Sequence, residues 1–216
     1  MSGRGPASSG HQLRPTEVKR LNRQWRRQTH ARLALLLDSV TQPFNVGSII
    51  RSAAAFGVER IWLAGSTAPP GHRSARKASL GTERFVIFDE EPSAVAAAKT
   101  AVSAGFRVVA VELADGAVPL HNAPLGADVC LALGNEDHGC SPALLAAAAA
   151  VTYIPQVGRV GSLNVAVAAA VALADPSKEM KMDGPTSRSQ PKIEFEGCLI
   201  RGKGRALLVF IVRAVW

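Results

Sequence analysis

Short apolar runs alternate with helix-forming segments along most of this chain, and this alternation constrains the fold more than any other feature. The runs are four or five residues long and stand at residues 33–37, 60–64, 85–88, 107–111, 129–133 and 151–154. Strands that are apolar throughout are typical of a parallel sheet with both faces covered by helices. The sequence therefore predicts an α/β fold with a mostly parallel sheet and helices on both of its faces.

Five segments beside these runs have the composition of helices. They are residues 15–28, 46–56, 92–104, 142–149 and 163–174. Ser162 is the expected N-cap of the last helix. The chain has 216 residues and is 47% apolar, which suffices for one sizeable core, and no apolar run approaches the roughly 18 residues of a membrane helix. We therefore expect one cytoplasmic domain with appendages.

Positive charge is concentrated near the N-terminus. Residues 1–32 contribute +7 to the formal net charge of +8, from eight basic residues and the single acid Glu17. The basic residues are Arg4, Arg14, Lys19, Arg20, Arg23, Arg26, Arg27 and Arg32. Trp25, set among arginines, suits stacking on an unpaired RNA base beside phosphate contacts. A solvated tail and a transit peptide are the alternatives, and the second is disfavoured because no clear apolar face accompanies the charges.

These features divide the chain into three parts. We expect a basic, partly disordered RNA-binding extension at residues 1–32, the α/β core at residues 33–174 and an atypical tail at residues 175–216. Within the tail, residues 183–191 are rich in turn formers and residues 206–216 are apolar enough for a strand. Because the predicted strands and the loops that follow them lie within the core, we expect the functional site there.

Three loops that follow predicted strands are unusually rich in amides, glycines and charged residues. They are Pro43-Phe44-Asn45-Val46-Gly47-Ser48-Ile49-Ile50-Arg51, Leu133-Gly134-Asn135-Glu136-Asp137-His138-Gly139-Cys140 and Ile154-Pro155-Gln156-Val157-Gly158-Arg159-Val160-Gly161-Ser162-Leu163-Asn164-Val165. In α/β proteins, ligands bind at the carboxyl ends of the strands, where such loops meet. The first strand is not followed by GxGxxG, no GxxxxGK[ST] is present, and the cysteines and histidines lack metal-ligand spacing. An ordinary dinucleotide, nucleotide-triphosphate or metal site is therefore not indicated.

The order and spacing of the three loops closely resemble the signature motifs of the TrmH (SpoU) branch of the SPOUT RNA methyltransferases. The resemblance covers residues 33–174, and residues 77–82 are similar to an internal loop of that family. It implies an α/β fold with a C-terminal trefoil knot and an obligate homodimer that shares its active sites. It also implies that S-adenosylmethionine donates a methyl group to a ribose 2′-hydroxyl of structured RNA.

The resemblance assigns catalytic roles to five residues. Arg51 matches the motif arginine, either as the base for the ribose hydroxyl or as a bidentate phosphate clamp. Deprotonating a guanidinium near neutral pH costs roughly 7 kcal/mol, so the clamp is the less demanding role. Asn45 would orient Arg51 or the ribose, and Glu136 would hold these side chains in place. Ser162 and Asn164 would contact substrate phosphate and the loop that carries the arginine.

The cofactor site implied by the resemblance uses the second and third loops. Gly134, Ile154 and Leu163 would line the cofactor, while Pro155 and Gly158 would shape the turn beside it. Glycines permit the close backbone approach that such a site needs. No metal is expected.

Some positions depart from the family's pattern. Phe44 stands where histidine is frequent, Gln156 stands where methionine is common, and residues 175–216 lack the usual charged C-terminal helix. Only some thirty residues precede the core, which favours transfer RNA as substrate, with a D-loop guanosine the leading nucleotide by analogy. A ribosomal RNA ribose, a noncatalytic RNA-binding protein and an unrelated small-molecule enzyme are the alternatives.

Overall fold

The computed structural model describes residues 12–29, 31–126 and 128–175, together with the backbone of residues 192–202 and 205–215. The chain forms two units, residues 1–182 and residues 183–216. The predicted disorder within residues 1–11 and the predicted turns of residues 183–191 lie outside the described residues.

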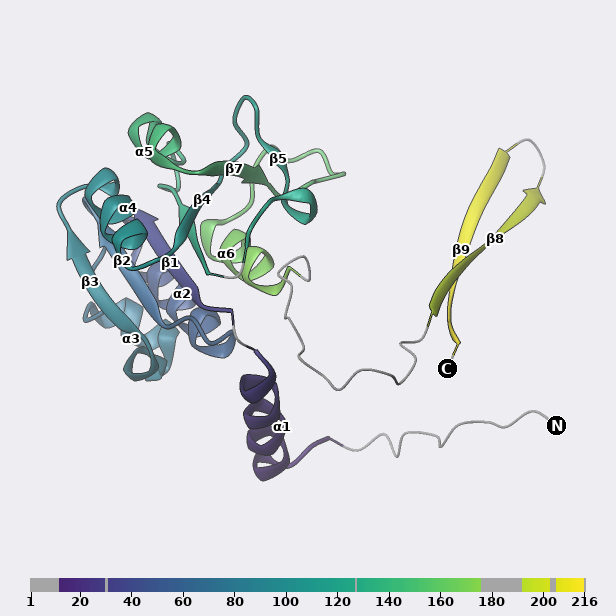
Figure 1. Ribbon diagram of the computed structural model, residues 1–216, viewed down its shortest axis with the longest axis horizontal. Coiled ribbons are helices and arrows are strands. Elements are labelled where there is room, and N and C mark those ends of the chain that lie inside the picture. The colour runs from purple at the N-terminus through teal and green to yellow at the C-terminus, as the bar shows by residue number, and fades with distance from the viewer. Residues whose placement is uncertain (1–11, 30, 127, 176–191, 203–204, 216) are drawn as a thin grey trace. The chain divides into compact units, whose positions relative to one another are not determined.

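The first unit contains a seven-stranded sheet in which every strand pair is parallel, with the order β3-β2-β1-β6-β4-β7-β5 (Figure 1). Its strands are β1 (Leu33–Asp38), β2 (Arg60–Ala64), β3 (Ile87–Glu91), β4 (Arg107–Val111), β5 (Val118–Pro119), β6 (Val129–Leu133) and β7 (Ala150–Tyr153). Its helices are α1 (Pro15–Gln28), α2 (Pro43–Ala55), α3 (Arg73–Ser79), α4 (Ala94–Ser103), α5 (Pro142–Ala147) and α6 (Val165–Ala174), with short 3₁₀ turns η1 (Thr82–Phe85) and η2 (Leu120–Asn122). The predicted parallel α/β architecture is confirmed.

Two hydrophobic clusters cover the opposite faces of the sheet. Leu35 and Leu37 of β1 point into the cluster that contains α2 and α6, whereas Ala34 and Leu36 point into the cluster with α4 and α5. All four of these β1 side chains have no exposed surface, as the central position of β1 requires. The alternation explains why residues 34–37 of β1 are all apolar, because successive side chains enter different cores.

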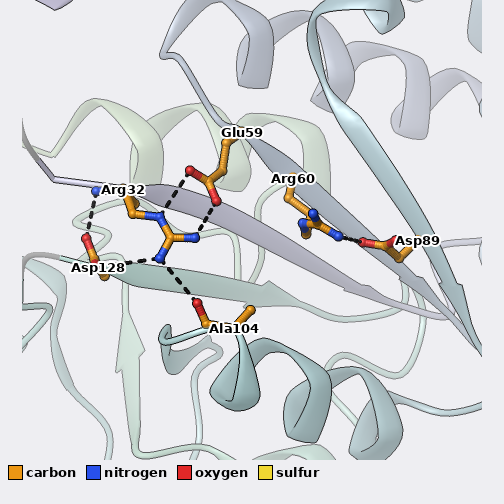
Figure 2. Close-up of polar contacts among 6 residues, drawn as sticks. All are labelled: Arg32, Glu59, Arg60, Asp89, Ala104 and Asp128. Carbon is orange, nitrogen blue, oxygen red and sulfur yellow. Dashed lines mark hydrogen bonds and ion pairs between the residues drawn. The ribbon is translucent and has the colours of Figure 1, made fainter.

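Local boundaries differ from the predicted ones in the segment between β2 and β3. Residues 73–79 form α3, a helix that the sequence pattern did not predict and that overlaps the internal loop expected at residues 77–82. Strand β3 begins at Ile87 because residues 82–85 form a 3₁₀ turn. Phe85, placed in the strand by its apolar character, is 62% exposed. Pairing with β2 decides the start of β3, with Ile87 opposite Arg60, and Arg60 also donates a hydrogen bond to Asp89 (Figure 2).

Arg32 anchors the chain just before β1. Its backbone N–H donates to Asp128 Oδ1 at 3.0 Å, and its guanidinium donates to both oxygens of Glu59 at 3.2 and 2.7 Å and to the carbonyl of Ala104 at 3.2 Å (Figure 2). The guanidinium carbon also lies 4.3 Å from the centre of the Phe106 ring. The hydrogen bond with Glu59 is the main reason why the pKa of Arg32 is raised. These contacts hold the Arg32 side chain against the core, so Arg32 is not one of the cations of the basic extension that are available to RNA.

The second unit is a hairpin of two antiparallel strands, β8 (Lys192–Gly202) and β9 (Arg205–Val215). Its register pairs Lys192 with Val215 at one end and Gly202 with Arg205 at the other. The expected strand at the end of the chain corresponds to β9. Within the described residues, no helix is both long and apolar enough to cross a membrane.

Candidate functional site

A cleft of about 580 Å³ lies at the carboxyl ends of β4, β6 and β7 and beside the start of α6. Six predicted site residues line it: Gly134, Glu136, Ile154, Ser162, Leu163 and Asn164. Asn45, Arg51, Pro155 and Gly158 are not among its lining residues within the described part of the chain. The second and third loops thus meet at one cleft, which is where parallel sheets generally bind ligands.

A chain of hydrogen bonds joins all three loops. The Asn45 amide nitrogen donates to Glu136 Oε1 at 2.9 Å, and the Asn164 amide nitrogen donates to Asn45 Oδ1 at 3.0 Å. Asn45 is only 8% exposed, so these partners replace water for its side chain. The first loop is thereby held to the two loops that line the cleft, although Asn45 does not line the cleft itself.

Glu136 also holds the segment that precedes α2. Its carboxylate accepts hydrogen bonds from the backbone N–H groups of Thr41 and Gln42, both at 3.1 Å. Burial by itself would raise the pKa of Glu136, but the hydrogen bonds from Asn45 and from backbone N–H groups outweigh burial, so its pKa lies below the ordinary 4.5. The carboxylate is therefore charged at neutral pH and acts as an acceptor for the first loop.

Asn164 has a second role as the N-cap of α6. Its Oδ1 accepts from the backbone N–H groups of Ala166 at 2.9 Å and Val167 at 3.4 Å. The prediction that Ser162 caps this helix is wrong, because the helix begins at Val165 and Asn164 occupies the cap position. A single amide thus satisfies two helix N–H groups through its oxygen and binds Asn45 through its nitrogen.

Arg51 and Ser162 are the two predicted catalytic residues outside this hydrogen-bond chain. Both are exposed, and within the described residues neither side chain has a hydrogen bond or an ion pair. Helix α2 begins at Pro43 instead of the expected residue 46, so Asn45 lies in its first turn and Arg51 six residues further along. Six residues at about 100° each rotate Arg51 roughly 120° away from Asn45, so the two side chains do not share a helix face.

Gly134 shapes the floor of the cleft. A Cβ atom at this position would lie 2.0 Å from the backbone carbon of Gly139 and 2.1 Å from the nitrogen of Cys140. Only glycine allows this close approach within the loop, in which residues 135 and 139 form a backbone bridge. At Gly158, by contrast, an added Cβ would meet nothing within 4 Å, and Pro155 is also exposed.

Two carboxylates that sequence reasoning missed hold the far end of the same loop. Asp38, at the end of β1, accepts from the backbone N–H of Ser141 at 2.9 Å, and Glu112, just after β4, accepts from that of Cys140 at 2.8 Å. Because β6 lies between β1 and β4, residues at the ends of both neighbouring strands hold the loop after β6 by hydrogen bonds. The available signal was an acidic residue placed directly at the end of an apolar strand. Glu112 also lines the cleft.

The structure defines an α/β protein with a cleft at the carboxyl edge of a parallel sheet. Hydrogen bonds join three loops, far apart in sequence, beside this cleft. The chain belongs to the SpoU rRNA Methylase family, whose family model matches residues 32–174. The resemblance found in the three loops is thereby confirmed.

Individual relatives agree with this membership. The chain is 32% identical over 149 residues to the 23S rRNA (guanosine-2′-O-)-methyltransferase of Acinetobacter baylyi, covering 68% of this chain and 60% of that protein. It is 29% identical over 175 residues to the tRNA (guanosine(18)-2′-O)-methyltransferase of Escherichia coli, covering 79% of this chain and 75% of that protein. The chain thus spans about six tenths of the first of these relatives.

Among solved structures, the chain is similar to the SpoU methyltransferase AviRb of Streptomyces viridochromogenes in complex with the cofactor AdoMet. The TM-score is 0.62 at 28% identity, and the match covers 71% of this chain and 59% of that chain.

Proposed function

We propose that this chain transfers a methyl group from S-adenosylmethionine to a ribose 2′-hydroxyl of structured RNA, with transfer RNA the preferred substrate and ribosomal RNA the alternative. The observation that carries the proposal is the hydrogen-bond chain Glu136–Asn45–Asn164, which joins the three family motifs at one cleft. Relatives named for both RNA classes support RNA as the substrate, since one acts on 23S rRNA and another on guanosine 18 of tRNA.

The cleft fits the methyl donor in size and chemistry. Its volume of about 580 Å³ lies within the roughly 300–1,000 Å³ of small-molecule sites. Gly134, Ile154 and Leu163 would hold the cofactor through backbone and apolar contacts, with Pro155 and Gly158 shaping the turn beside it. When bound, S-adenosylmethionine supplies an electrophilic methyl group on a sulfonium. The nearby Glu136 and Glu112 carboxylates make the cleft favourable for a cation.

The protein's own residues would mainly position the ribose. Arg51 is exposed, so the donors of its guanidinium are free for a phosphate of the substrate. We assign it the clamp role, with Ser162 as a second polar contact to the backbone of the RNA. Asn45, Glu136 and Asn164 would hold the loops that bind the ribose and the methyl donor, and such positioning can supply most of the rate enhancement.

The remaining family features belong to the same proposal. The knot would be formed by the segment from β6 to α6, and the active unit would be a homodimer. Exposed apolar side chains support a partner surface on α2 and α6: Phe44 is 64% exposed, Val167 49% and Val171 41%. We further propose that the basic extension of residues 1–32 binds RNA, except through Arg32, whose guanidinium is paired with Glu59. In the same proposal, residues 33–174 form the methyltransferase domain, residues 175–216 form a separate tail, and the enzyme is cytoplasmic.

A transfer assay tests the function. Purified full chain is incubated with methyl-labelled S-adenosylmethionine and either bulk transfer RNA or ribosomal RNA, beside Arg51→Ala and the control Arg107→Ala. Arg107 is an exposed arginine at the start of β4, on the edge of the sheet opposite the cleft. We expect alkali-resistant labelled dinucleotides from the parent and the control, and little label from Arg51→Ala. Label on a base, equal activity of Arg51→Ala, or RNA binding without any transfer would refute the assignment.

A further inference from the structure

Helix α1 separates its charges from its apolar residues on opposite faces. At about 100° per residue, Lys19, Arg20, Arg23, Arg26 and Arg27 fall within an arc of roughly 120°. Val18, Leu21 and Trp25 fall within a narrower arc of roughly 60°, centred almost opposite to the first. We call the first arc the arginine face and the second the apolar stripe.

The apolar stripe corrects two expectations drawn from sequence. Trp25 is not set among the arginines in space, and the segment does have an apolar face, with Val18 39%, Leu21 42% and Trp25 44% exposed. A base stacked on Trp25 would therefore lie on the opposite side of the helix from the cations that bind its backbone. The arginines and Trp25 do not form one platform for an unpaired nucleotide.

The arginine face is free to bind a partner. All five of its side chains are exposed, and within the described residues none of them forms an ion pair or hydrogen bond. Glu17, the one acid of the helix, instead accepts a hydrogen bond from the backbone N–H of Arg14. The partner that fits an array of unpaired cations is a polyanion.

We propose that the arginine face binds the phosphate backbone of a double-helical stem of the RNA substrate, a step that rests on the function proposed above. The helix has 14 residues and is about 21 Å long, so its cations form a rigid strip. Double-stranded nucleic acid presents phosphates at close spacing along such a length. Single strands are generally bound by cations interleaved with aromatic platforms, an arrangement that α1 does not offer.

The point at which α1 joins the core indicates that the arginine face acts in RNA binding and not in methyl transfer. The helix joins the core through Arg32, at the amino end of β1, whereas the cleft lies at the carboxyl ends of the strands. A β1 of six residues separates these two edges by about 20 Å. The arginine face therefore contributes affinity for the RNA and no chemistry at the ribose.

The test compares two variants of the full chain on two probes. Arg20→Gln/Arg23→Gln/Arg27→Gln removes three cations while keeping good helix formers, and Trp25→Ala removes the aromatic ring alone. The probes are an RNA duplex of 20 base pairs and a single-stranded oligouridylate of 20 nucleotides, with binding measured by fluorescence anisotropy over a range of salt concentrations.

We expect the parent to prefer the duplex and the triple variant to bind it roughly 10- to 100-fold more weakly. Its plot of log affinity against log salt should be less steep by roughly 0.9 for each phosphate that the variant no longer neutralises. Trp25→Ala should bind the duplex as the parent does. In the transfer assay the triple variant should raise KM with kcat unchanged.

Three results would overturn the proposal: an unchanged salt dependence in the triple variant, equal or tighter binding of the single strand, or loss of duplex binding in Trp25→Ala. Arg51→Ala separates this proposal from the proposed function, because it should abolish transfer while removing at most one phosphate contact. Its salt slope for duplex binding should therefore fall by no more than about 0.9, whereas the triple variant can lose three such contacts. Duplex binding through the arginine face without any methyl transfer by the parent would refute the proposed function alone.

Discussion

Asn45→Asp changes one amide nitrogen to oxygen and tests whether the hydrogen-bond chain stabilises the three-loop site. In the structure, the Asn45 amide donates to Glu136 Oε1 across 2.9 Å, and Asn45 is 8% exposed. An aspartate of the same shape has no donor when ionised, so two carboxylates would face each other at this distance. The hydrogen bond from Asn164 to residue 45 could still form.

The expected cost follows from this geometry. Two unit charges 2.9 Å apart repel by about 6 kcal/mol at an effective dielectric constant near 20. Relaxation and the partial exposure of Glu136 reduce this, so we expect Asn45→Asp to lower the free energy of unfolding by about 2–4 kcal/mol at pH 8. Asn45→Ala removes both hydrogen bonds without adding a charge, and we expect a smaller loss of about 1–3 kcal/mol.

The dependence on pH distinguishes repulsion from misfit. The Glu136 carboxylate should raise the pKa of an aspartate at position 45 above the roughly 3.9 of an unfolded chain. A raised acid pKa in the folded state means that stability is lost as the pH rises above about 4, until that aspartate is ionised in both states. When protonated, the aspartate can donate to Glu136 as the amide does, so the variant should recover toward the parent at pH 5.

Urea unfolding, followed by tryptophan fluorescence at pH 8 and pH 5, measures the effect. Asn122→Asp is the control, because Asn122 is an exposed amide in η2. The reasoning is refuted if Asn45→Asp is as stable as the parent at pH 8, if it is no less stable than Asn45→Ala there, or if the control shows the same dependence on pH.

Three further perturbations probe the site and the anchor. Gly134→Ala would place a methyl group about 1.5 Å too close to the facing backbone. We therefore expect the free energy of unfolding to fall by about 1–3 kcal/mol and the binding of S-adenosylmethionine, measured by calorimetry, to weaken. Gly71→Ala is the control and should have neither effect, because a Cβ atom at that position meets nothing within 4 Å. The lowered pKa of Glu136 adds stability above pH 4.5 that is lost as the pH falls through its folded pKa; Glu136→Gln should lack this part of the acid sensitivity in a pH titration of stability. Arg32→Ala should lower the midpoint of urea unfolding, and an unchanged midpoint would show that its hydrogen bonds are not stabilising.

The architecture could be predicted from the sequence because the pattern of apolar residues within each segment indicates whether that segment is a helix or a buried strand. Residues 60–64, 107–111 and 129–133 were predicted as strands with the bounds that the structure shows. Their apolar runs need cover on both faces, and only a parallel sheet between helices supplies it. Helix α1 was also predicted with its observed bounds, since Pro15 marks its first turn.

Prediction from the sequence chose the wrong residue where two residues were equally suited to one position. Ser162 and Asn164 are both good N-cap residues, and the sequence offers no means of choosing between them. The structure selects Asn164 because its amide also reaches Asn45, 119 positions away in the chain. Similarly, Trp25 lies beside arginines in the sequence, but helical rotation places it on the other face.

By itself, the sequence determined the class of fold, the three loops and the residue types within them. Only the tertiary structure decided which side chains meet, since Asn45 and Glu136 are 91 positions apart and the Asp38 and Glu112 contacts depend on the strand order β1-β6-β4. The tertiary structure also showed that Arg32 belongs to the core and not to the basic extension. The physical reason is that periodicity reports burial along one element, whereas hydrogen-bond partners depend on how separate elements are placed in space.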